Sequence, residues 1–220
     1  MKTKVDLSRT GIVDRALDIA DHEGVSAITV RRLAQEFGVT PMALYWHVKS
    51  KDELLEAMGD RFFDDLEVRT ESAWDEQLRA AVSALVASLR RHPGAAHLAA
   101  PRVLQCEAGR ELAEHTLGYL RAEGFTIEQA TDIARTAMQT AAMLVCEEAG
   151  AELGVAAERR AEVIEAKHRA ISNLPRDRFP NLVACADALT QTPDHDAYYT
   201  FGVDLFISGV QRLHAAQLAS

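Results

Sequence analysis

Residues 40 to 51 gather the side chains of this chain that are best suited to contact a nucleic acid. The segment is TPMALYWHVKSK, which combines aromatic and basic side chains within a dozen positions. Thr40 can accept hydrogen bonds from the free amides of a new helix, and Pro41 suits the first helical position because its missing N–H would have no partner there. The segment therefore predicts a DNA-facing helix that begins at Pro41.

The DNA-facing helix must be very short, because a second helix begins almost at once. Ser50 and Glu53 have the spacing of a capping box, in which two residues satisfy each other's backbone amides. We expect the next helix to span residues 51 to about 67, with an apolar side formed by Leu54, Leu55, Met58, Phe62 and Leu66. This helix would start at the DNA and end in the rest of the molecule, so it can act as a lever between them.

Two earlier helices must support so short an element. Residues 9 to 23 predict an amphipathic helix, ended by Gly24, whose apolar face carries Ile12, Ala16, Ile19 and Ala20. Thr29 precedes a second helix over residues 30 to 37, and a tight turn that contains Gly38 leads to the DNA-facing helix. Two helices joined by a short turn with glycine make a helix-turn-helix, whose second helix lies in the major groove of DNA.

The stretch from residue 29 to residue 56 resembles the DNA-binding domain of the tetracycline-repressor family. Within it, residues 44 to 49 (LYWHVK), Lys51 and residues 54 to 55 are similar to the branch of the family that contains the tetracycline repressor itself. The resemblance returns near the C-terminus. There, residues 179 to 182 and 199 to 205 are similar to the end of that branch's regulatory domain.

The resemblance implies an all-α fold with two domains. A three-helix helix-turn-helix domain would cover residues 1 to 52, and a larger helical domain that binds an effector and dimerises would cover residues 53 to 220. It also implies a homodimeric transcriptional repressor that leaves a palindromic DNA operator when a small molecule, apolar or polycyclic, binds. Activation in place of repression, and a regulator without an effector, stay open as alternatives.

Several residues of this region are candidates for contact with DNA. An arginine can bind guanine through two parallel hydrogen bonds, and the family's pattern gives this role to Arg31, whereas Arg32 can be an ordinary solvated charge. Met42 and Ala43 can press on thymine methyl groups. Trp46 either rests against the sugar-phosphate backbone or covers the core of the domain. The remaining candidates are Thr29, Pro41 and the phosphate-holding set Thr40, Tyr45, His47 and Lys51.

The charge distribution favours contact with DNA through the N-terminal end alone. A formal net charge of −9 argues against a nucleic-acid partner, because neutralisation of phosphate dominates non-specific affinity. Residues 1 to 51, however, contain eight basic and six acidic residues and so carry +2, which leaves −11 for the remaining 169 residues. The duplex would repel this acidic remainder.

Cysteine usage and the lack of targeting signals predict a cytoplasmic protein. Cys106, Cys146 and Cys185 are odd in number, widely spaced and set among apolar residues, which favours buried thiols over disulfides. No apolar run approaches the length of a membrane span, and no charged-then-apolar leader opens the chain. We therefore expect no contact with a membrane.

The rest of the chain is helical by pattern, and nothing in it predicts a sheet. A short irregular or helical piece should end at Pro101, and Ser72 should precede a helix that runs to about residue 91. The other expected helices span residues 107 to 123, 126 to about 150, 158 to 172, 180 to 190 and 196 to 218. Thr126 and Gln129 form a second capping-box pattern. Two of these helices are candidates for a dimer interface, through Ala130, Ala134, Ala137 and Ala141 in one and Tyr198, Phe201, Leu205 and Phe206 in the other. By pattern alone, the same helices could form intramolecular core.

The resemblance also suggests residues for an effector pocket. In the tetracycline-repressor branch the drug binds as a metal chelate; Glu147 matches a glutamate that the other subunit contributes, and His97 lies within a residue or two of the metal-facing histidine. Glu67 and Ala81 stand where a drug-binding histidine and asparagine are expected, which argues against tetracycline. The pocket candidates, each of which could instead be plain core or rim, are Phe62, Phe63, Trp74, Leu85, His97, His115, Met138, Gln139 and Glu147.

An enzymatic role is the remaining alternative. Glu165 and His168 have the Glu-x-x-His spacing used in di-metal carboxylate bundles, and Glu111 and His115 share another helix face. Such sites need two motifs of this kind and two further carboxylates, whereas this chain has one motif among solvated charges. We therefore expect no enzyme, no catalytic residue, no cofactor and no metal site.

Overall fold

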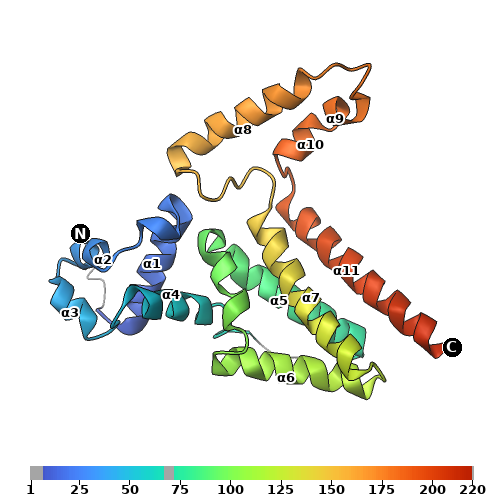
Figure 1. Cartoon of the computed structure of the whole chain (residues 1–220), viewed down its shortest axis with the longest axis horizontal. Coiled ribbons are helices and arrows are strands. Elements are labelled where there is room, and N and C mark those ends of the chain that lie inside the picture. Colours follow the sequence, from blue (N-terminus) through green and yellow to red (C-terminus); the bar gives the residue numbers. More distant parts are fainter. Residues whose placement is uncertain (1–6, 67–71, 220) are drawn as a thin grey trace.

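The computed structural model describes residues 7 to 66 and 72 to 219, and within these ranges it contains helices and no strand (Figure 1). The N-terminal helices are α1 (Arg9–Glu23), α2 (Val30–Phe37), α3 (Pro41–Tyr45) and α4 (Lys51–Asp60), with the short 3-10 helix η1 (Val25–Ala27) after α1. The remaining elements are α5 (Trp74–Arg90), η2 (Pro93–Leu98), η3 (Ala100–Arg102), α6 (Glu107–Ala122), α7 (Ile127–Cys146), α8 (Ala157–Ser172), α9 (Pro180–Ala184), α10 (Ala186–Thr190) and α11 (His195–Leu218). The expected all-α architecture is confirmed.

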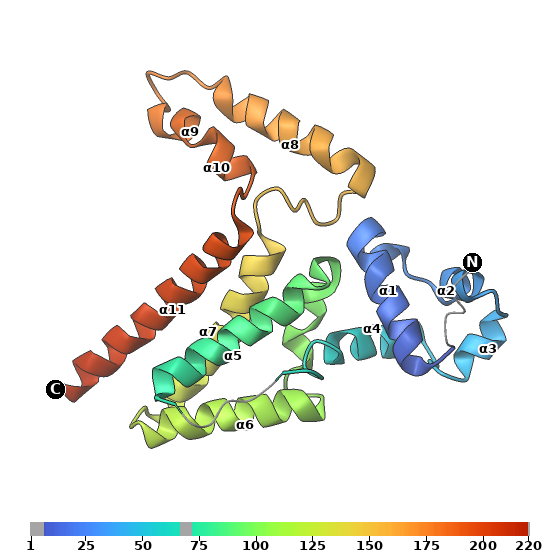
Figure 2. The same cartoon turned by 180° about the vertical axis from the view of Figure 1, so that it is seen from behind.

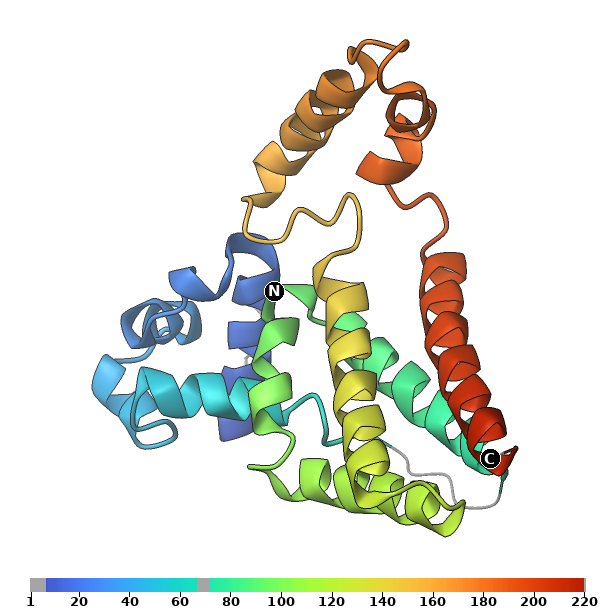
Figure 3. The same ribbon diagram turned by 45° about the vertical axis from the view of Figure 1, so that its right-hand side comes forward.

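The helices are arranged as a small N-terminal group, a body and an outlying arm. Helices α1 to α4 lie at one end, and α5, α6, α7 and α11 form the body, in which α11 packs on α5 and α7 (Figure 3). Helices α8 to α10 extend away from the body (Figure 2), and α8 contains no buried residue. Arg160 of this arm donates a hydrogen bond of 2.6 Å to the backbone carbonyl of Asp21, near the end of α1.

Side-chain caps confirm the predicted starts of α2, α3 and α4. In each case a hydroxyl oxygen accepts the backbone amide three residues ahead: Thr29 from Arg32 at 3.1 Å, Thr40 from Ala43 at 3.4 Å and Ser50 from Glu53 at 3.0 Å. Gly38 adopts the left-handed conformation, with φ of 66° and ψ of 31°, which a residue with a Cβ atom rarely adopts. The sharp turn between α2 and α3 follows from this glycine.

Of the two predicted capping boxes, the one that opens α7 is confirmed, with reciprocal distances of 3.2 and 2.8 Å. The box before α4 is only half formed. The Glu53 carboxylate accepts the backbone amide of Lys49 at 2.8 Å, one residue before Ser50. Arg9 of α1 lies 2.5 Å from the same carboxylate and holds it in that position.

The predicted lever helix is shorter than expected. Helix α4 ends at Asp60, and the chain then continues in turns, while residue 67 lies outside the described residues. Asp60 and Asp65 place negative charge at a helix C-terminus, where the helix dipole disfavours it. Arg61 pairs with Asp65 at 3.0 Å and with Asp14 of α1 at 3.3 Å, which fixes the turn against α1.

Three other expectations need correction. Helix α7 ends at Cys146 instead of near residue 150: Glu147 already departs from helical values, with φ of −108° and ψ of 16°, and Gly150 and Glu152 follow with positive φ. The helix expected over residues 180 to 190 is split into α9 and α10 at Cys185, which has φ of −99° and ψ of 8°. The thiol of Cys185 is exposed, not buried, since it lies in the outlying arm; Cys106 and Cys146 are half-buried free thiols.

Two glycines allow backbone segments to approach closely where the N-terminal helices meet the body. A Cβ atom added at Gly94 of η2 would overlap the backbone carbonyl of Ala20 in α1. A Cβ atom added at Gly59 of α4 would likewise overlap the carbonyl of Leu98, at the end of η2. The 3-10 helix η2 is thereby held between α1 and α4 with no room for a side chain at either contact.

Polar contacts fix the same junction. The Asp21 carboxylate accepts the backbone amide of Gly94 at 2.9 Å and pairs with His92 at 2.8 Å. Arg102 of η3 pairs with Asp60 of α4 at 2.7 Å. Buried apolar residues from α1 to α11 form one continuous core across this junction. The expected domain boundary after residue 52, which falls within α4, stays a prediction.

Replacing Gly94 by alanine should lower the free energy of unfolding by about 1 to 3 kcal/mol, because the added methyl group would meet backbone and not a movable side chain. Urea unfolding followed by circular dichroism measures the change. Gly118→Ala in α6 is the matched control, since nothing lies within 4 Å of the added Cβ atom. That variant should be more stable than the parent by about 0.5 to 1 kcal/mol. Equal stability of Gly94→Ala and the parent would contradict a tightly held η2.

Candidate DNA interface and effector cavity

Helix α3 is anchored by few buried residues. Leu44 and the following Val48 are buried together with Leu33 of α2. The large exposed side chains of the same segment are those of Met42, Tyr45 and Trp46, and Trp46 is 86% exposed. Trp46 therefore does not cover the core, which was one of its two expected roles, and its indole is available to a partner.

Most arginines of the N-terminal helices are already paired. Arg32 binds Glu23 through two hydrogen bonds of 2.7 and 2.9 Å and approaches Glu36 at 3.3 Å. Arg15 pairs with Glu36 at 2.8 Å. Within the described part of these helices, the cationic side chains that make no hydrogen bond or ion pair are Arg31, Lys49 and Lys51. The cations available to phosphate or bases thus flank α3, and Arg31, not Arg32, is the free arginine.

The carboxylates in these pairs have lowered pKa values. A hydrogen bond from Arg32 lowers the pKa of Glu23, one from Arg15 lowers the pKa of Glu36, and one from Arg9 lowers the pKa of Glu53. All three carboxylates lie at the surface, so each pair stabilises the fold weakly. Because the folded pKa lies below the ordinary value of 4.5, this stabilisation is present above that pH and is lost as the pH falls through the folded pKa.

The Glu53 carboxylate fixes the turn between α3 and α4. It accepts the Arg9 guanidinium at 2.5 Å and the Lys49 amide at 2.8 Å, and Arg9 also donates to the carbonyl of His47 at 3.1 Å. The backbone at His47 and Lys49 is therefore held from α1, while their side chains stay available. The role of Arg9 could not be predicted from the sequence, since no local pattern links Arg9 to Glu53, 44 positions away.

The candidate DNA-contacting residues occupy two neighbouring stretches of the structure. Thr29 and Arg31 lie at the start of α2, and the others lie between Thr40 and Lys51. The hydroxyls of Thr29 and Thr40 cap helices, Pro41 is the first residue of α3, and Ala43 and His47 are half-buried. The contacts of all these residues with DNA stay predictions.

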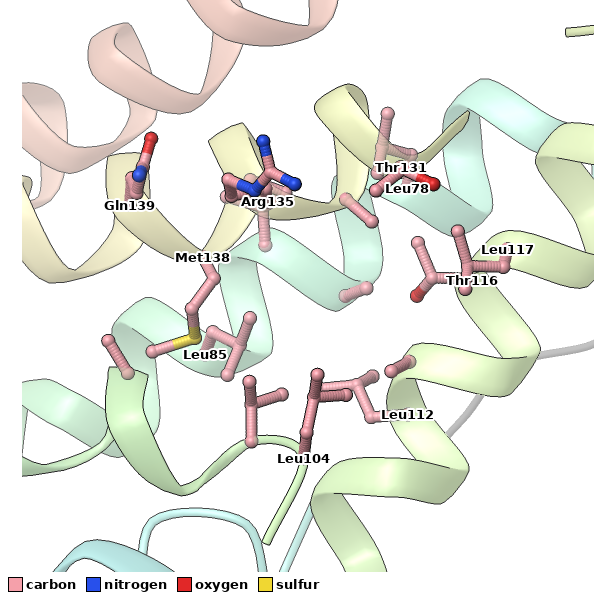
Figure 4. A pocket seen from close by; sticks show the side chains of 17 residues that line it. Leu78, Leu85, Leu104, Leu112, Thr116, Leu117, Thr131, Arg135, Met138 and Gln139 are labelled. Atoms are coloured by element: carbon pink, nitrogen blue, oxygen red, sulfur yellow. The ribbon is translucent and has the colours of Figure 1, made fainter. Parts of the chain in front are cut away.

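A largely apolar cavity of about 320 Å³ lies in the body, between α5, α6, α7 and the segment that starts with η3 (Figure 4). Arg135 and Gln139 come from α7 on one side of it, and Leu104 and Leu112 lie on the opposite side (Figure 4). Its other lining residues are Leu78, Ala81, Val82, Leu85, Ala100, Val103, Ala113, Thr116, Leu117, Thr131, Ala134, Ala137 and Met138. A cavity of this size and composition suits a small organic ligand.

The structure brings only part of the predicted effector set to this cavity. Leu85, Met138 and Gln139 line it. The others lie elsewhere: Phe62 and Phe63 are core residues, Trp74 packs against Phe125 with ring centroids 5.4 Å apart, His115 contacts Gln77 at 3.2 Å, and His97 and Glu147 are exposed. Ala81 lines the cavity, whereas Glu67 lies outside the described residues.

Three polar lining residues, Thr116, Thr131 and Arg135, were not among our sequence-based candidates. Thr116 lies on the buried side of the amphipathic helix α6, whereas Thr131 and Arg135 lie one helical turn apart on α7, where Arg135 is more than half exposed. Periodicity alone, however, predicts buried residues and does not distinguish a packed core from a cavity wall.

Helix α11 exposes a row of apolar side chains along one face. Phe201 and Leu205 are 67% and 66% exposed, and Leu213 continues the row beyond Gly209. On the adjacent α7, Met143 is also exposed. The alanines considered for a dimer interface follow the intramolecular alternative instead, since Ala130, Ala137 and Ala141 are buried within the subunit and Ala134 lines the cavity.

The structure also bears on metal and membrane sites. No group of three or more His, Cys, Asp or Glu side chains within the described ranges is placed to hold a metal ion. The imidazole of His168, from the Glu-x-x-His motif, instead contacts Asp187 at 2.7 Å. No helix in the described part of the chain is long and apolar enough to cross a membrane.

The chain matches two family profiles that together cover most of its length. Residues 12 to 58 match "Bacterial regulatory proteins, tetR family", and residues 69 to 214 match "Tetracyclin repressor-like, C-terminal domain". The tetracycline repressor protein class G of Vibrio anguillarum is 28% identical over 223 residues, or 99% of each chain. An HTH-type transcriptional regulator of Saccharopolyspora erythraea is 32% identical over 126 residues, which cover 56% of this chain and 53% of that regulator.

Solved structures show the same similarity. The TetR family protein ActR of Streptomyces coelicolor in complex with actinorhodin has a TM-score of 0.70 and 29% identity, and the match covers 95% of this chain and 99% of ActR. BioQ with its natural double-stranded DNA operator has a TM-score of 0.56 and 27% identity over 84% of this chain and 99% of BioQ. ActR was thus solved with actinorhodin, and BioQ with its DNA operator.

Replacing Arg31 by alanine removes the free arginine at the start of α2. If Arg31 reads guanine, affinity for a DNA site selected by the protein should fall by about 5- to 150-fold, as expected for the loss of 1 to 3 kcal/mol, while affinity for random duplex falls much less. Fluorescence anisotropy with both duplexes gives the ratio. Arg32→Ala is the control: it should lower the melting temperature but leave this ratio unchanged. If this affinity ratio changes in Arg32→Ala and not in Arg31→Ala, Arg32 and not Arg31 contacts the base.

Replacing Glu53 by glutamine should weaken binding to the selected site about threefold or more, because the Arg9 and Lys49 contacts that hold the turn are lost. Removing a negative charge near DNA would by itself strengthen binding, so a loss of affinity identifies positioning. The slope of log affinity against log salt should stay unchanged. In Lys51→Ala, by contrast, the slope should become shallower by about 1. Stronger binding by Glu53→Gln would show that the turn does not depend on this carboxylate.

Proposed function

This chain belongs to the tetracycline-repressor family of bacterial regulatory proteins, and from that premise we propose that it is a homodimeric transcriptional repressor. In this proposal it binds a palindromic operator and releases it when an organic effector enters the cavity between α5, α6 and α7. The observation that carries the proposal is that unpaired cations gather around α3 at one end of the described structure and a largely apolar cavity lies in the body. We place the protein in the cytoplasm.

The DNA-binding part of the proposal assigns roles by chemistry. Arg31 reads guanine, and Met42 and Ala43 contact thymine methyl groups. The phosphate backbone is held by Thr40, Tyr45, His47 and Lys51, with Trp46 packed on sugar and phosphate. These assignments are supported by the exposure of Met42, Tyr45 and Trp46 and by the lack of other partners for Arg31 and Lys51 within the described residues.

Dimerisation supplies the second reading helix. One helix-turn-helix contacts too few base pairs to find a single site, and two of them about 34 to 36 Å apart read a palindrome on one face of DNA. The exposed row of Phe201, Leu205 and Leu213 on α11, with Met143 on α7, is the surface that supports a symmetric contact. An apolar row of this length is unfavourable in water and is buried when two copies meet.

The effector would act through the segment that forms one wall of the cavity. Ala100, Val103 and Leu104 of this wall follow directly after η2, which is clasped between α1 and α4. Arg102 of the same segment pairs with Asp60 of α4. A ligand that displaces the wall therefore displaces both helices that carry the DNA-reading elements. Operator release follows if the ligand prefers the displaced conformation.

Two alternatives are weaker. A regulator without an effector would have no need of a cavity of about 320 Å³ in its body, whereas a well-packed core leaves few voids larger than a water molecule. An enzyme is not supported, because the family consists of transcriptional regulators.

Selection from a random duplex library should return inverted half-sites separated by about one helical turn or a multiple of it. On the selected operator, Leu205→Asp in α11 should yield monomers in sedimentation experiments and weaken binding about 100-fold, because linked half-site binding is lost. Ser83→Asp on the exposed side of α5 adds the same charge outside the α11 face and should change neither property. A monomeric parent protein with full affinity would overturn the dimer.

A further inference from the structure

We propose that the effector is a largely apolar organic anion, such as a carboxylate or phenolate, that binds without a divalent metal ion and is held by Arg135. The inference rests on the proposed role of the cavity as the effector site. It names the class of ligand, which neither the family nor the fold determines.

The side chains that line the cavity indicate that most of the ligand is apolar. Apart from Thr116, Thr131, Arg135 and Gln139, every lining side chain is aliphatic or thioether. A ligand in the cavity would therefore cover apolar side chains along most of the lining, which favours a hydrophobic or aromatic frame by about 25 cal/mol per Å² of apolar surface removed from water. Polyhydroxylated ligands such as sugars would leave their hydroxyl groups without partners here.

The lining lacks groups that could hold a metal ion. It contains no His, Cys, Asp or Glu side chain. Mg²⁺ requires oxygen ligands, usually including carboxylates, and would here be placed beside the positive charge of Arg135. His97, which the sequence placed near the metal-facing position, and Glu147 are both exposed and do not line the cavity. The residues therefore do not fit a metal chelate.

Arg135 is the ionisable residue of the described lining, and its present partner is weak. It pairs with Asp132 at 3.1 Å, and both side chains are more than half exposed, so this pair contributes little. A ligand anion could take the guanidinium from Asp132 at small cost and gain a charge-assisted hydrogen bond, bidentate if it is a carboxylate.

Helix α7 presents the groups that an apolar anion needs in two adjacent rows. Thr131, Arg135 and Gln139 follow one another at intervals of four residues and so share one helix face. Ala134 and Met138 line the cavity beside them. Figure 4 shows Arg135 and Gln139 at one side and Leu104 and Leu112 opposite. The anionic group would lie at the polar row and the frame against the leucines.

Thr116 adds a polar contact on the α6 side. Its side chain is only 6% exposed, and its hydroxyl is directed toward the cavity in Figure 4. A ligand with a hydroxyl or carbonyl at the end remote from its anionic group could form a hydrogen bond with this hydroxyl. The cavity thus fits an aromatic acid with a second oxygen substituent better than a simple fatty acid.

Two fluorescent probes with a common frame test the inference. Anilinonaphthalene sulfonate is anionic, phenylnaphthylamine is its neutral counterpart, and both become fluorescent in apolar sites. The parent protein should bind the anion in the presence of EDTA as tightly as with added Mg²⁺. Arg135→Gln should weaken binding of the anion about fivefold or more and leave the neutral probe unaffected. Arg110→Gln, outside the cavity on α6, is the matched control and should change neither affinity.

A cavity-filling variant separates failure of this inference from failure of the proposed effector site. Ala113→Phe should weaken both probes, with circular dichroism used to check its fold and Ala113→Leu as a milder second variant. If filling the cavity affects neither probe, the cavity is not the binding site and both proposals are overturned. If filling blocks both probes but Arg135→Gln affects them equally, the effector site stands and the anion assignment falls. Anion binding that requires Mg²⁺ would overturn the metal-free assignment.

Discussion

The close backbone approaches at Gly94 and Gly59 are the constraint on which the rest of the arrangement depends. Through them η2 touches α1 and α4 main chain to main chain. Side chains can absorb a small shift by changing rotamer, but packed backbone cannot, so a displacement of η2 is passed on without being damped. Arg9 at the far end of α1 and Ser50 at the start of α4 then frame the turn that follows α3. The cavity wall is therefore linked to α3 through η2, α1 and α4.

The N-terminal helices divide their positive charge between structure and recognition. Arg9, Arg15 and Arg32 are used within the fold, where they pair with Glu53, Glu36 and Glu23. Few side-chain cations stay free near α3, and the rest of the chain is acidic. Since non-specific affinity scales with the number of phosphates neutralised, such a protein gains little from random DNA. Its preference for an operator must come mainly from shape and base contacts, which act only when both reading helices are in place.

Local signals in the sequence were sufficient for the DNA-facing end. Hydroxyl caps at Thr29, Thr40 and Ser50 and the left-handed Gly38 depend on neighbours within three residues, and all appear as expected. The errors arise from tertiary contacts. Arg9 diverts the Glu53 carboxylate, and Arg61 turns the chain at the end of α4. The cavity was the least predictable feature, because an alanine or leucine on an inward helix face has the same periodicity whether it meets another side chain or empty space.

The exposed apolar row on α11 has a consequence for how operator occupancy depends on the concentration of the protein. If two copies must bury Phe201 and Leu205 together before either holds an operator, occupancy rises with the square of protomer concentration when dimers are scarce. If this face is the dimer interface, the affinity of the two copies for each other would set the protomer concentration below which the operator stays unoccupied, whatever the effector concentration.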